Sequence, residues 1–486
     1  MQKEKSLKFN FVMNSLLTVS SIIFPLITFP YVSRILLPEG NGRVSFASSV
    51  IAYFTMIAQL GIPTYGVRAC AKKRNDKEEL SRTVHELFII NIIMSLFVYF
   101  IFACSLYLVP QFREEKTLFL ITSSTILFNS IGVEWLYKGL EQYTYITTRS
   151  IIFKFIALIA TFLLIHQQSD YEVYAAISIF AASASNILNF FNAHKYIIVK
   201  PVGNYHIKQH LKPVYIFFAM SCATTIYTNL DTVMLGFLMG NIEVGYYNAA
   251  IKIKTILVSV VTSLGVVMLP RASYYVEQGM NAEFMRINKK AINFVILAAM
   301  PIMLYFISFA REGIFFLSGN EFEASILPMQ IIMPTLLFIG LTNIMGIQML
   351  VPLGKEKIVL YSVIAGACVN LVINFILIPR MASCGAAIGT LIAEMVVWIV
   401  QYMALRNVVG EIYKSLRYAP IIIALVLGSI SSLWVKSLPL IDFFKLVITS
   451  LLFFGVYVFV LIVFKEPLIV EMGRFIVRRI FKNKMY

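Results

Sequence analysis

Apolar segments of roughly membrane-spanning length follow one another along almost the whole chain of 486 residues. A helix needs about 20 mostly apolar residues to cross the hydrocarbon core of a bilayer. Helices satisfy their own backbone hydrogen bonds there, whereas an isolated strand does not. The pattern therefore predicts an all-α integral membrane protein with about 14 transmembrane helices, at residues 10–33, 44–66, 84–109, 117–137, 150–166, 172–193, 213–238, 246–269, 290–309, 326–350, 358–378, 386–404, 419–435 and 443–464.

The basic residues are distributed unevenly among the connectors between these segments. Most of the 41 Lys and Arg residues lie in alternate connectors, beginning with the N-terminus and ending with the C-terminal tail. The positive-inside rule makes this set cytoplasmic, so both termini are expected inside. Topology then explains the net charge of +16, and no nucleic-acid partner is expected. The tail at 465–486 mixes basic and apolar residues, which predicts an amphipathic helix on the inner leaflet.

Composition leaves no room for a sizeable domain in water. Hydrophobic residues make up 59% of the chain and charged residues 14%, against about 25% charged in a typical soluble domain. The five cysteines are scattered, and His206 and His210 are four residues apart with no cysteine or carboxylate beside them in the sequence. We therefore expect no disulfide and no metal site. Because the connectors offer no sizeable loop and no nucleotide-binding pattern, we expect no catalytic residue and no enzymatic activity.

A weak repeat relates the two halves of the sequence. Gly42 and Gly245 each open a segment that ends in Leu-Gly, and an arginine, Arg68 or Arg271, follows 26 residues after each glycine. The copies are six spans apart, so both would cross the membrane in the same direction, as in transporters built from two lobes. This predicts an N-terminal six-span lobe at 1–193, a cytoplasmic linker at 194–212, a C-terminal six-span lobe at 213–404, two extra spans at 405–464 and the basic tail at 465–486.

Several stretches, taken in order, resemble a known family. They are Phe29-Pro30-Tyr31-Val32-Ser33-Arg34-Ile35-Leu36 with Gly40-Asn41-Gly42, Leu60-Gly61-Ile62-Pro63 with Tyr65-Gly66-Val67-Arg68, Glu134-Trp135-Leu136-Tyr137-Lys138-Gly139-Leu140-Glu141, and Asp231-Thr232-Val233-Met234-Leu235-Gly236 with Val244-Gly245-Tyr246-Tyr247. Together they are similar to the polysaccharide repeat-unit flippases (Wzx type) of the multidrug/oligosaccharidyl-lipid/polysaccharide exporter superfamily.

The resemblance implies two six-helix lobes around a central polar cavity, with two extra C-terminal helices. It also implies a function: moving an oligosaccharide repeat unit on undecaprenyl diphosphate from the inner to the outer leaflet, for O-antigen or capsule synthesis. The implied partners are this lipid-linked oligosaccharide, membrane lipids and the polysaccharide polymerase machinery, and the implied location is the bacterial cell membrane (plasma or inner membrane). Cations in such a cavity would offset the several kcal/mol that an unpaired diphosphate costs in hydrocarbon.

Four cations are candidates for contact with that diphosphate. Arg34 and Arg43 flank the first outer connector, and arginine can bind a phosphate through two parallel hydrogen bonds. Anchoring in the lipid headgroups is the alternative for both. Lys252 and Lys254 lie about 10 to 13 Å into the eighth span. Because they are two residues apart on a helix, at most one should face the cavity. An ion pair with Asp231 or snorkelling to the outer interface are the alternatives for these lysines.

Two carboxylates are candidates for coupling transport to a proton or sodium gradient, and no bound cofactor is expected. Asp231 lies in the seventh span at a depth similar to that of Lys252 and Lys254, so a structural ion pair is its alternative role. Glu394 lies near the middle of its span, where a carboxylate is costly and often functional. A hydrogen-bonded structural carboxylate is equally consistent with that position.

The first span carries an unusually polar face. Asn14, Thr18, Ser21, Pro25 and Thr28 follow one another at spacings of three or four residues, so they share one side of a helix. Such a face lines either a polar cavity or a contact between helices. We expect the cavity, because prolines also permit the bending that alternating access requires.

Three other readings remain. A cation-coupled drug or metabolite exporter of the same superfamily would resemble the same fold but lack the stretch 134–141. A peptidoglycan lipid-precursor flippase is a closer sibling that physical reasoning alone does not separate. A membrane glycosyltransferase or polymerase would need a sizeable loop with catalytic residues, and the connectors are too short to provide one.

Overall fold

The computed structural model describes residues 7–471, and within this range it contains helices and no strands. The predicted all-α fold is confirmed, whereas the predicted basic helix of the tail lies almost entirely outside the described residues. The helices are α1 (Leu7–Gln59), α2 (Ile62–Lys72), α3 (Lys77–Leu108), α4 (Pro110–Glu114), α5 (Lys116–Ile131), α6 (Glu134–Gly139), α7 (Tyr143–Leu164), α8 (Tyr171–Ile179), α9 (Asn186–Asn192), α10 (Lys208–Leu238), α11 (Asn241–Glu277), α12 (Asn281–Ser308), α13 (Ala310–Ser318), α14 (Ile326–Ile332), α15 (Thr335–Thr342), α16 (Glu356–Lys414), α17 (Tyr418–Leu433) and α18 (Asp442–Val463).

Short helical turns of other types connect several of these helices. Two of them are π-helices, η2 (Phe180–Ala184) and η5 (Asn343–Leu350). The remaining four are 3-10 turns, η1 (Gln168–Asp170), η3 (Ala193–Lys195), η4 (Asn320–Ser325) and η6 (Trp434–Ser437).

Nine helical segments within residues 7–471 are long and apolar enough to cross a bilayer, or ten if one bent pair, Asn320–Ile332 with Thr335–Leu350, counts as a single span. Two of the nine, Val12–Lys72 and Glu356–Lys414, contain 61 and 59 residues. Each is long enough to cross twice, since one crossing takes about 20 residues. Each also contains non-helical backbone, at Leu37 (φ 58°) and at Ala382 (φ 48°). The count of 14 crossings stays a prediction.

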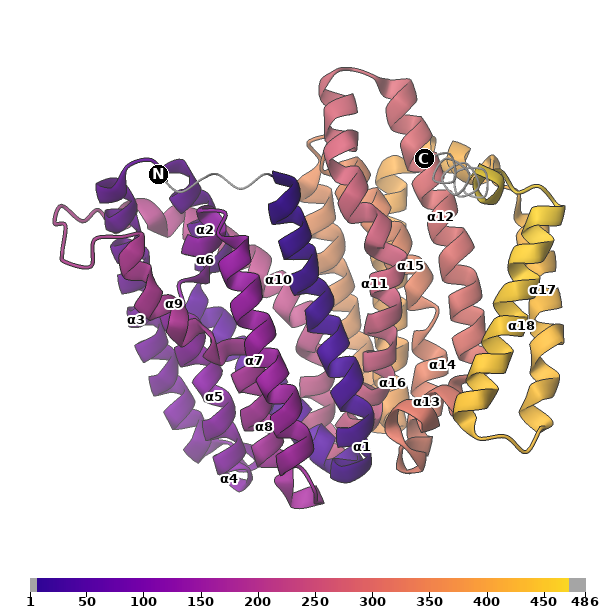
Figure 1. Ribbon diagram of the computed structural model, residues 1–486, viewed down its shortest axis with the longest axis horizontal. Coiled ribbons are helices and arrows are strands. Elements are labelled where there is room, and N and C mark those ends of the chain that lie inside the picture. Colours follow the sequence, from indigo (N-terminus) through magenta and orange to yellow (C-terminus); the bar gives the residue numbers. More distant parts are fainter. Residues whose placement is uncertain (1–6, 472–486) are drawn as a thin grey trace, which may run out of the picture. The chain divides into compact units, whose positions relative to one another are not determined.

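The chain forms two compact units, residues 1–245 and 246–486. In Figure 1 the long helices of each unit lie side by side. Helix α10, the predicted first helix of the C-terminal lobe, belongs to unit 1, where it packs against α1 and α2. The predicted lobe and linker boundaries are not tested by this division and stay predictions.

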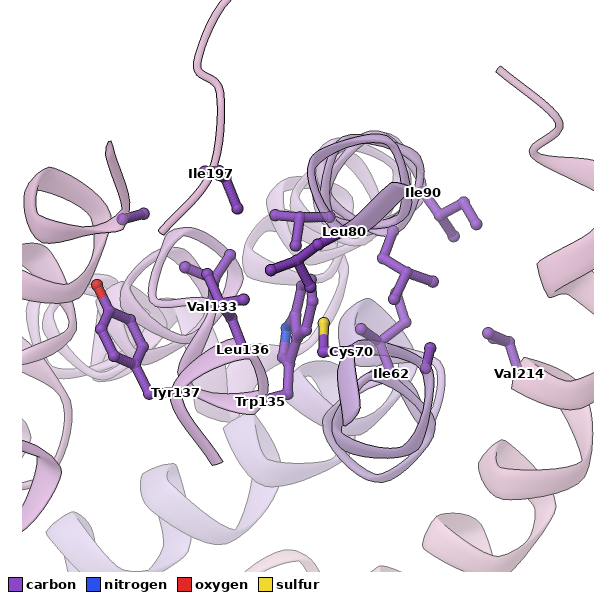
Figure 2. Close-up of a cluster of buried hydrophobic side chains, with 14 of the residues drawn as sticks. Ile62, Cys70, Leu80, Ile90, Val133, Trp135, Leu136, Tyr137, Ile197 and Val214 are labelled. Atoms are coloured by element: carbon purple, nitrogen blue, oxygen red, sulfur yellow. The ribbon is translucent and has the colours of Figure 1, made fainter. Parts of the chain in front are cut away.

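A buried apolar cluster at one end of unit 1 joins α2, α3, α6 and the start of α10. Figure 2 shows Trp135 near its centre, with Leu80 and Cys70 close by. Trp135 is 4% exposed and Leu136 and Tyr137 are fully buried. The other buried members are Leu60, Ile62, Ala69, Val84, Leu87, Ile90, Val133, Ile146, Ala193, Ile197 and Val214.

In unit 2, the two C-terminal helices pack on α12. Tyr305 of α12 is buried with Phe453 of α18, and its hydroxyl donates to the Leu446 carbonyl (2.9 Å). The Tyr457 hydroxyl of α18 donates in turn to the Leu297 carbonyl (3.0 Å). Buried tyrosines with satisfied hydroxyls add a specific register to apolar packing. Helices α17 and α18 are thus fixed to the rest of unit 2.

Candidate functional site

Unit 1 contains a cavity of about 580 Å³ between its membrane-spanning helices, in the size range of ligand pockets. Its walls come from the second half of α1, the start of α2, and from α5, α8, η2 and α10. The lining residues are Ser48, Ile51, Ala52, Thr55, Met56, Gln59, Gly61, Pro63, Thr122, Thr125, Asn129, Ser178, Ile179, Ala182, Ser221, Thr225 and Asn229.

The chemistry of this lining is polar but uncharged. Ten of the 17 residues that line the cavity carry a hydroxyl or an amide, and none is charged or aromatic. Hydroxyls and amides both donate and accept hydrogen bonds. Because an unsatisfied polar group is costly in a membrane interior, such a wall suits a ligand that is itself rich in hydroxyls. The sequence analysis missed these residues because it searched the spans mainly for charges.

Asn129 is held in the cavity wall by a chain of hydrogen bonds that starts at a buried arginine. The Arg149 guanidinium, 5% exposed, donates to the Ser185 carbonyl (2.7 Å) and to the Asn186 Oδ1 (3.5 Å). The Asn186 amide then donates to the Asn129 Oδ1 (3.1 Å). Helix α9, which provides Asn186, directly follows the π-helix η2, and π-helices are frequent at functional sites. This arrangement fixes the direction of one amide at the cavity.

The polar face of the first span is accessible in the structure. Asn14, Thr18, Ser21 and Pro25 are exposed and Thr28 is half-buried. The Thr18 hydroxyl donates to the Asn14 carbonyl (3.0 Å), so it is satisfied within its own helix. None of the residues that line the cavity of unit 1 belongs to this face. The assignment of Asn14 and Thr18 to a substrate path stays a prediction.

The two arginines near the first outer connector have different surroundings. Arg34 is exposed, and its guanidinium donates to the Pro30 carbonyl (2.5 Å). Arg43 is half-buried and lies 2.6 Å from Glu39 and 2.9 Å from Glu115, with the Tyr171 hydroxyl at 3.2 Å. A phosphate would therefore have to compete with two carboxylates at Arg43. Neither assignment to the substrate is tested by this geometry.

The remaining predicted residues lie in different units. Asp231 is 8% exposed, on α10 of unit 1. Lys252 and Lys254 lie on the part of α11 that belongs to unit 2, and both are half-buried. Glu394, on α16, is 6% exposed. The predicted ion pair of Asp231 with a lysine and the predicted coupling roles stay predictions.

Histidine 210 has a partner that its sequence neighbours did not reveal. Its Nε2 lies 2.6 Å from Glu86 of α3, and its Nδ1 lies 2.8 Å from the Tyr65 hydroxyl of α2. Glu86 is fully buried and also accepts from the His206 backbone amide and from Gln209 (3.1 Å). This network attaches the start of α10 to α2 and α3. No group of three or more metal-ligating side chains occurs among residues 7–471.

Two of the stretches that carry the family resemblance pack against each other. Gly66 lies on the Trp135 ring: a Cβ at this glycine would be 2.7 Å from two ring carbons. Gly139 lies in the same way against Cys70 and the Val67 carbonyl. The stretches 65–68 and 134–141 therefore form one tight contact between α2 and α6. Their role in the structure is packing.

A second pair of resemblance glycines forms another close contact. A Cβ at Gly42 would lie 1.7 Å from the Asn241 carbonyl oxygen, and a Cβ at Gly245 would lie 2.0 Å from the Pro38 carbonyl oxygen. Only glycine allows backbones to approach this closely. The two glycines that start the copies of the internal repeat thus join the turn of α1 to the start of α11.

Comparisons with known proteins agree with this fold. The sequence model of the family described as "Polysaccharide biosynthesis protein" matches residues 7–276, and that of the family MatE matches residues 217–376. The relative "Putative O-antigen transporter" of Escherichia coli (strain K12) is 24% identical over 408 residues, which cover 83% of this chain and 97% of the relative.

Two solved structures are similar over most of the chain. One is described as the lipid II flippase MurJ in an inward closed conformation, with a TM-score of 0.74, 17% identity, and coverage of 94% of this chain and 100% of that one. The other is an inward-facing multidrug resistance MATE family transporter of the MOP superfamily, with a TM-score of 0.59, 14% identity, and coverage of 84% and 100%. At such identities, the likeness shows the fold.

Proposed function

Because this chain belongs to the polysaccharide biosynthesis protein family, whose model matches more than half of it, we propose that it is a flippase for undecaprenyl-diphosphate-linked oligosaccharide repeat units. It would move them from the inner to the outer leaflet of a bacterial inner membrane, with both termini in the cytoplasm. The expected membership of the exporter superfamily is confirmed by the family matches and by the similar folds. The identity of the substrate, a lipid-linked oligosaccharide, is what the proposal adds to the family assignment.

The observation that carries this proposal is the uncharged, hydroxyl- and amide-rich cavity of unit 1. An oligosaccharide presents many hydroxyls, and Asn129, Asn229 and Gln59 can each donate and accept toward them. With no aromatic ring among the lining residues to stack on a sugar, binding would rest on hydrogen bonds, each with a net contribution of about 1 kcal/mol. Such modest affinity suits a transporter, because the substrate must be released from the site on the other side of the membrane.

In the predicted topology this cavity extends to the cytoplasmic side, from which the substrate would be loaded. Gly61 and Pro63 of its lining lie at the cytoplasmic end of the second predicted span, and Ser48 lies toward the other end. A sugar head could therefore enter from the cytoplasm while its lipid stays in the bilayer. In this scheme Arg34 would bind the diphosphate on the outer side. Arg43 could do the same if the diphosphate replaced Glu39 and Glu115 as its partners.

The coupling of transport belongs to the same proposal. Asp231 or Glu394 would carry a proton or sodium ion, and one of Lys252 and Lys254 would face the substrate path. A bound cofactor has no part in this scheme, which breaks no covalent bond. Delivery of the flipped repeat unit to polymerase machinery is a further part of the proposal.

The decisive experiment deletes the gene in its host and follows the lipid-linked repeat units. We expect them to accumulate on the cytoplasmic face, with no polymer at the surface, and the cloned gene should restore export. A peptidoglycan-precursor flippase would instead leave this polymer intact and block cell-wall synthesis, and a drug exporter would change drug sensitivity only. Normal surface polymer in a clean deletion without a second flippase would refute the proposal.

Residue roles can be tested in the complemented strain. Replacing Arg34 or Arg43 with Gln should reduce export more than replacing Arg478 of the tail, at equal membrane levels of protein. Equal losses at all three positions would remove the reason to assign the first two to the substrate.

A further inference from the structure

Lys154 is a charged residue within a membrane-spanning helix that the sequence analysis did not select. It lies on α7, 11 residues after the helix begins at Tyr143, which corresponds to about 16 Å along the helix axis. Lys154 lies at the middle of the candidate span Tyr143–Leu164, and the predicted span 150–166 places it about 6 Å from the cytoplasmic boundary. A charge at the centre of a span costs about 2.5 to 3.5 kcal/mol even on the most lenient scale, and such residues are functional candidates by default.

The partners of Lys154 are two hydroxyls of the first helix. Its Nζ donates to the Ser20 Oγ (3.0 Å) and to the Ser21 Oγ (2.7 Å) of α1. A third ammonium proton is available to another acceptor, because lysine has three donors and no acceptor. Neutral hydroxyls hold the ammonium group in place without cancelling its charge.

No carboxylate within residues 7–471 lies at ion-pair distance from Lys154. Glu134 is already shared by Lys138 (2.8 Å) and by the buried Arg149 (3.5 Å), and Glu141, just before α7, is paired with Arg74 (3.4 Å). With Lys154, four cations therefore lie near two carboxylates at this end of α1 and α7. The local excess of positive charge is suited to an anion.

The ammonium group also lies beside an accessible surface. Its partner Ser21 is exposed and shares one helix face with Asn14, Thr18 and Pro25, which are exposed as well. An anion that followed this polar face into the membrane would meet Lys154. The predicted topology places the start of both helices on the cytoplasmic side, where a lipid-linked substrate would be loaded.

We propose that Lys154 binds a phosphate oxygen of a lipid-linked diphosphate that enters along the polar face of α1. The proposal rests on the proposed function and adds the residue that holds the anionic part of the substrate, while the uncharged cavity takes the sugars. The oxyanion could belong to the polyprenyl diphosphate or to an ordinary phospholipid headgroup. The experiment separates these two sources.

The test measures lipid binding to the full-length protein in detergent by native mass spectrometry. The probes are undecaprenyl diphosphate, undecaprenol, which lacks phosphate, and phosphatidylglycerol. Lys154→Gln removes the charge, Lys154→Arg keeps it, and Lys138→Gln is the matched control, because Lys138 is a neighbouring cation already paired with Glu134.

We expect Lys154→Gln to weaken binding of undecaprenyl diphosphate by about tenfold to a hundredfold, the loss of one charge-assisted hydrogen bond. Lys154→Arg should retain most of the affinity, Lys138→Gln should resemble the wild type, and undecaprenol binding should not change. The Gln variant should fold, because it removes a buried charge rather than stranding one. Its heat stability in detergent checks this.

Equal binding of undecaprenyl diphosphate by the wild type and Lys154→Gln would overturn the proposal. So would an equal loss of phosphatidylglycerol binding, which would make Lys154 a general headgroup anchor. The proposed function fails separately, if the wild-type protein binds the diphosphate but deletion of its gene leaves repeat-unit export intact.

Discussion

Replacing Gly66 with Ala should destabilise unit 1, although alanine is the better helix former. The new Cβ would lie 2.7 Å from Cδ2 and Cε3 of Trp135 and 2.9 Å from Cγ. Carbon atoms prefer separations of about 3.5 to 4.0 Å, so the ring would have to move by close to 1 Å. Trp135 is 4% exposed, and Leu80 and Cys70 lie close to its ring in the same buried cluster, so the ring has little room.

The magnitude follows from two opposed terms. Overpacking of a well-packed core costs about 1 to 3 kcal/mol, and the change from Gly to Ala in a helix returns about 1 kcal/mol. We therefore expect a net loss between about 0 and 2 kcal/mol from these two terms, toward the upper end because the buried ring has little room to move. The matched control is Gly313→Ala in α13, also buried and helical, where the nearest atom to a new Cβ is Met329 Cε at 3.6 Å.

The assay heats the detergent-solubilised protein and measures, at each temperature, the fraction that stays monodisperse. The temperature at which half of the protein is lost is the midpoint. Gly66→Ala should lower the midpoint, Gly313→Ala should leave it unchanged or raise it, and adding Trp135→Leu should reduce the difference caused by Gly66→Ala. If Gly66→Ala proves as heat-stable as the wild type, the contact between α2 and α6 does not constrain the protein as argued.

Two further predictions concern buried charges. Glu86→Gln should lower the yield of folded protein, because removing a buried charge that accepts three hydrogen bonds costs about 1 to 3 kcal/mol or more. The control Glu78→Gln, at an exposed position, should not lower the yield. Equal yields of the two variants on a membrane immunoblot would contradict the prediction. Asp231→Asn should reduce membrane abundance if Asp231 pairs with Lys252 or Lys254, and the correct double change to Asn and Gln should restore abundance and flipping. An abundant but inactive Asp231→Asn protein would instead favour the coupling role.

The transmembrane character of the chain could be predicted because it depends on local quantities. Length and apolarity of each segment are read directly from neighbouring residues, and the charged connectors then give a direction. The breaks at Leu37 and Ala382 fall within the connectors predicted at 34–43 and 379–385. The break at Leu60 and Gly61 lies inside the predicted span 44–66, so the length and apolarity of that segment did not reveal it. The same is true of the division after Gly245.

The contact between two of the stretches that resemble the family could not be predicted from the sequence. Tyr65-Gly66-Val67-Arg68 and Glu134-Trp135-Leu136-Tyr137 were used to recognise a family, and their contact with each other gives them a packing role. The two stretches are about 70 residues apart, and no periodicity links residues at that separation. One signal was available: both stretches lie at predicted cytoplasmic ends of spans, where they could meet.

The sequence drew attention to charged residues and to the polar face with Asn14 and Thr18, and their roles stay predictions, whereas it did not indicate the lining of the cavity. A charge inside a span is conspicuous because it is expensive, so Asp231, Glu394 and Lys252 were selected at once. The cavity wall consists of single hydroxyls and amides on several helices. Placing one such group in a span costs little free energy, so its presence there does not by itself indicate a site. Lys154 lies four residues after the start of the predicted span 150–166, so the sequence pattern assigns it to the basic residues of the neighbouring connector.

That contrast has a physical basis in the proposed substrate, which combines a neutral, hydroxyl-rich head with a doubly phosphorylated link. Cations lining the sugar cavity would hold the diphosphate too tightly at the wrong place, and an uncharged site for the diphosphate would leave its charge unpaired at a cost of several kcal/mol. Separate sites remove this conflict, since hydrogen bonds of about 1 kcal/mol each can form and break along the path. In the proposed arrangement the single ammonium of Lys154, held by Ser20 and Ser21, would balance part of the charge, and the cavity that contains Asn129 would accommodate the sugars.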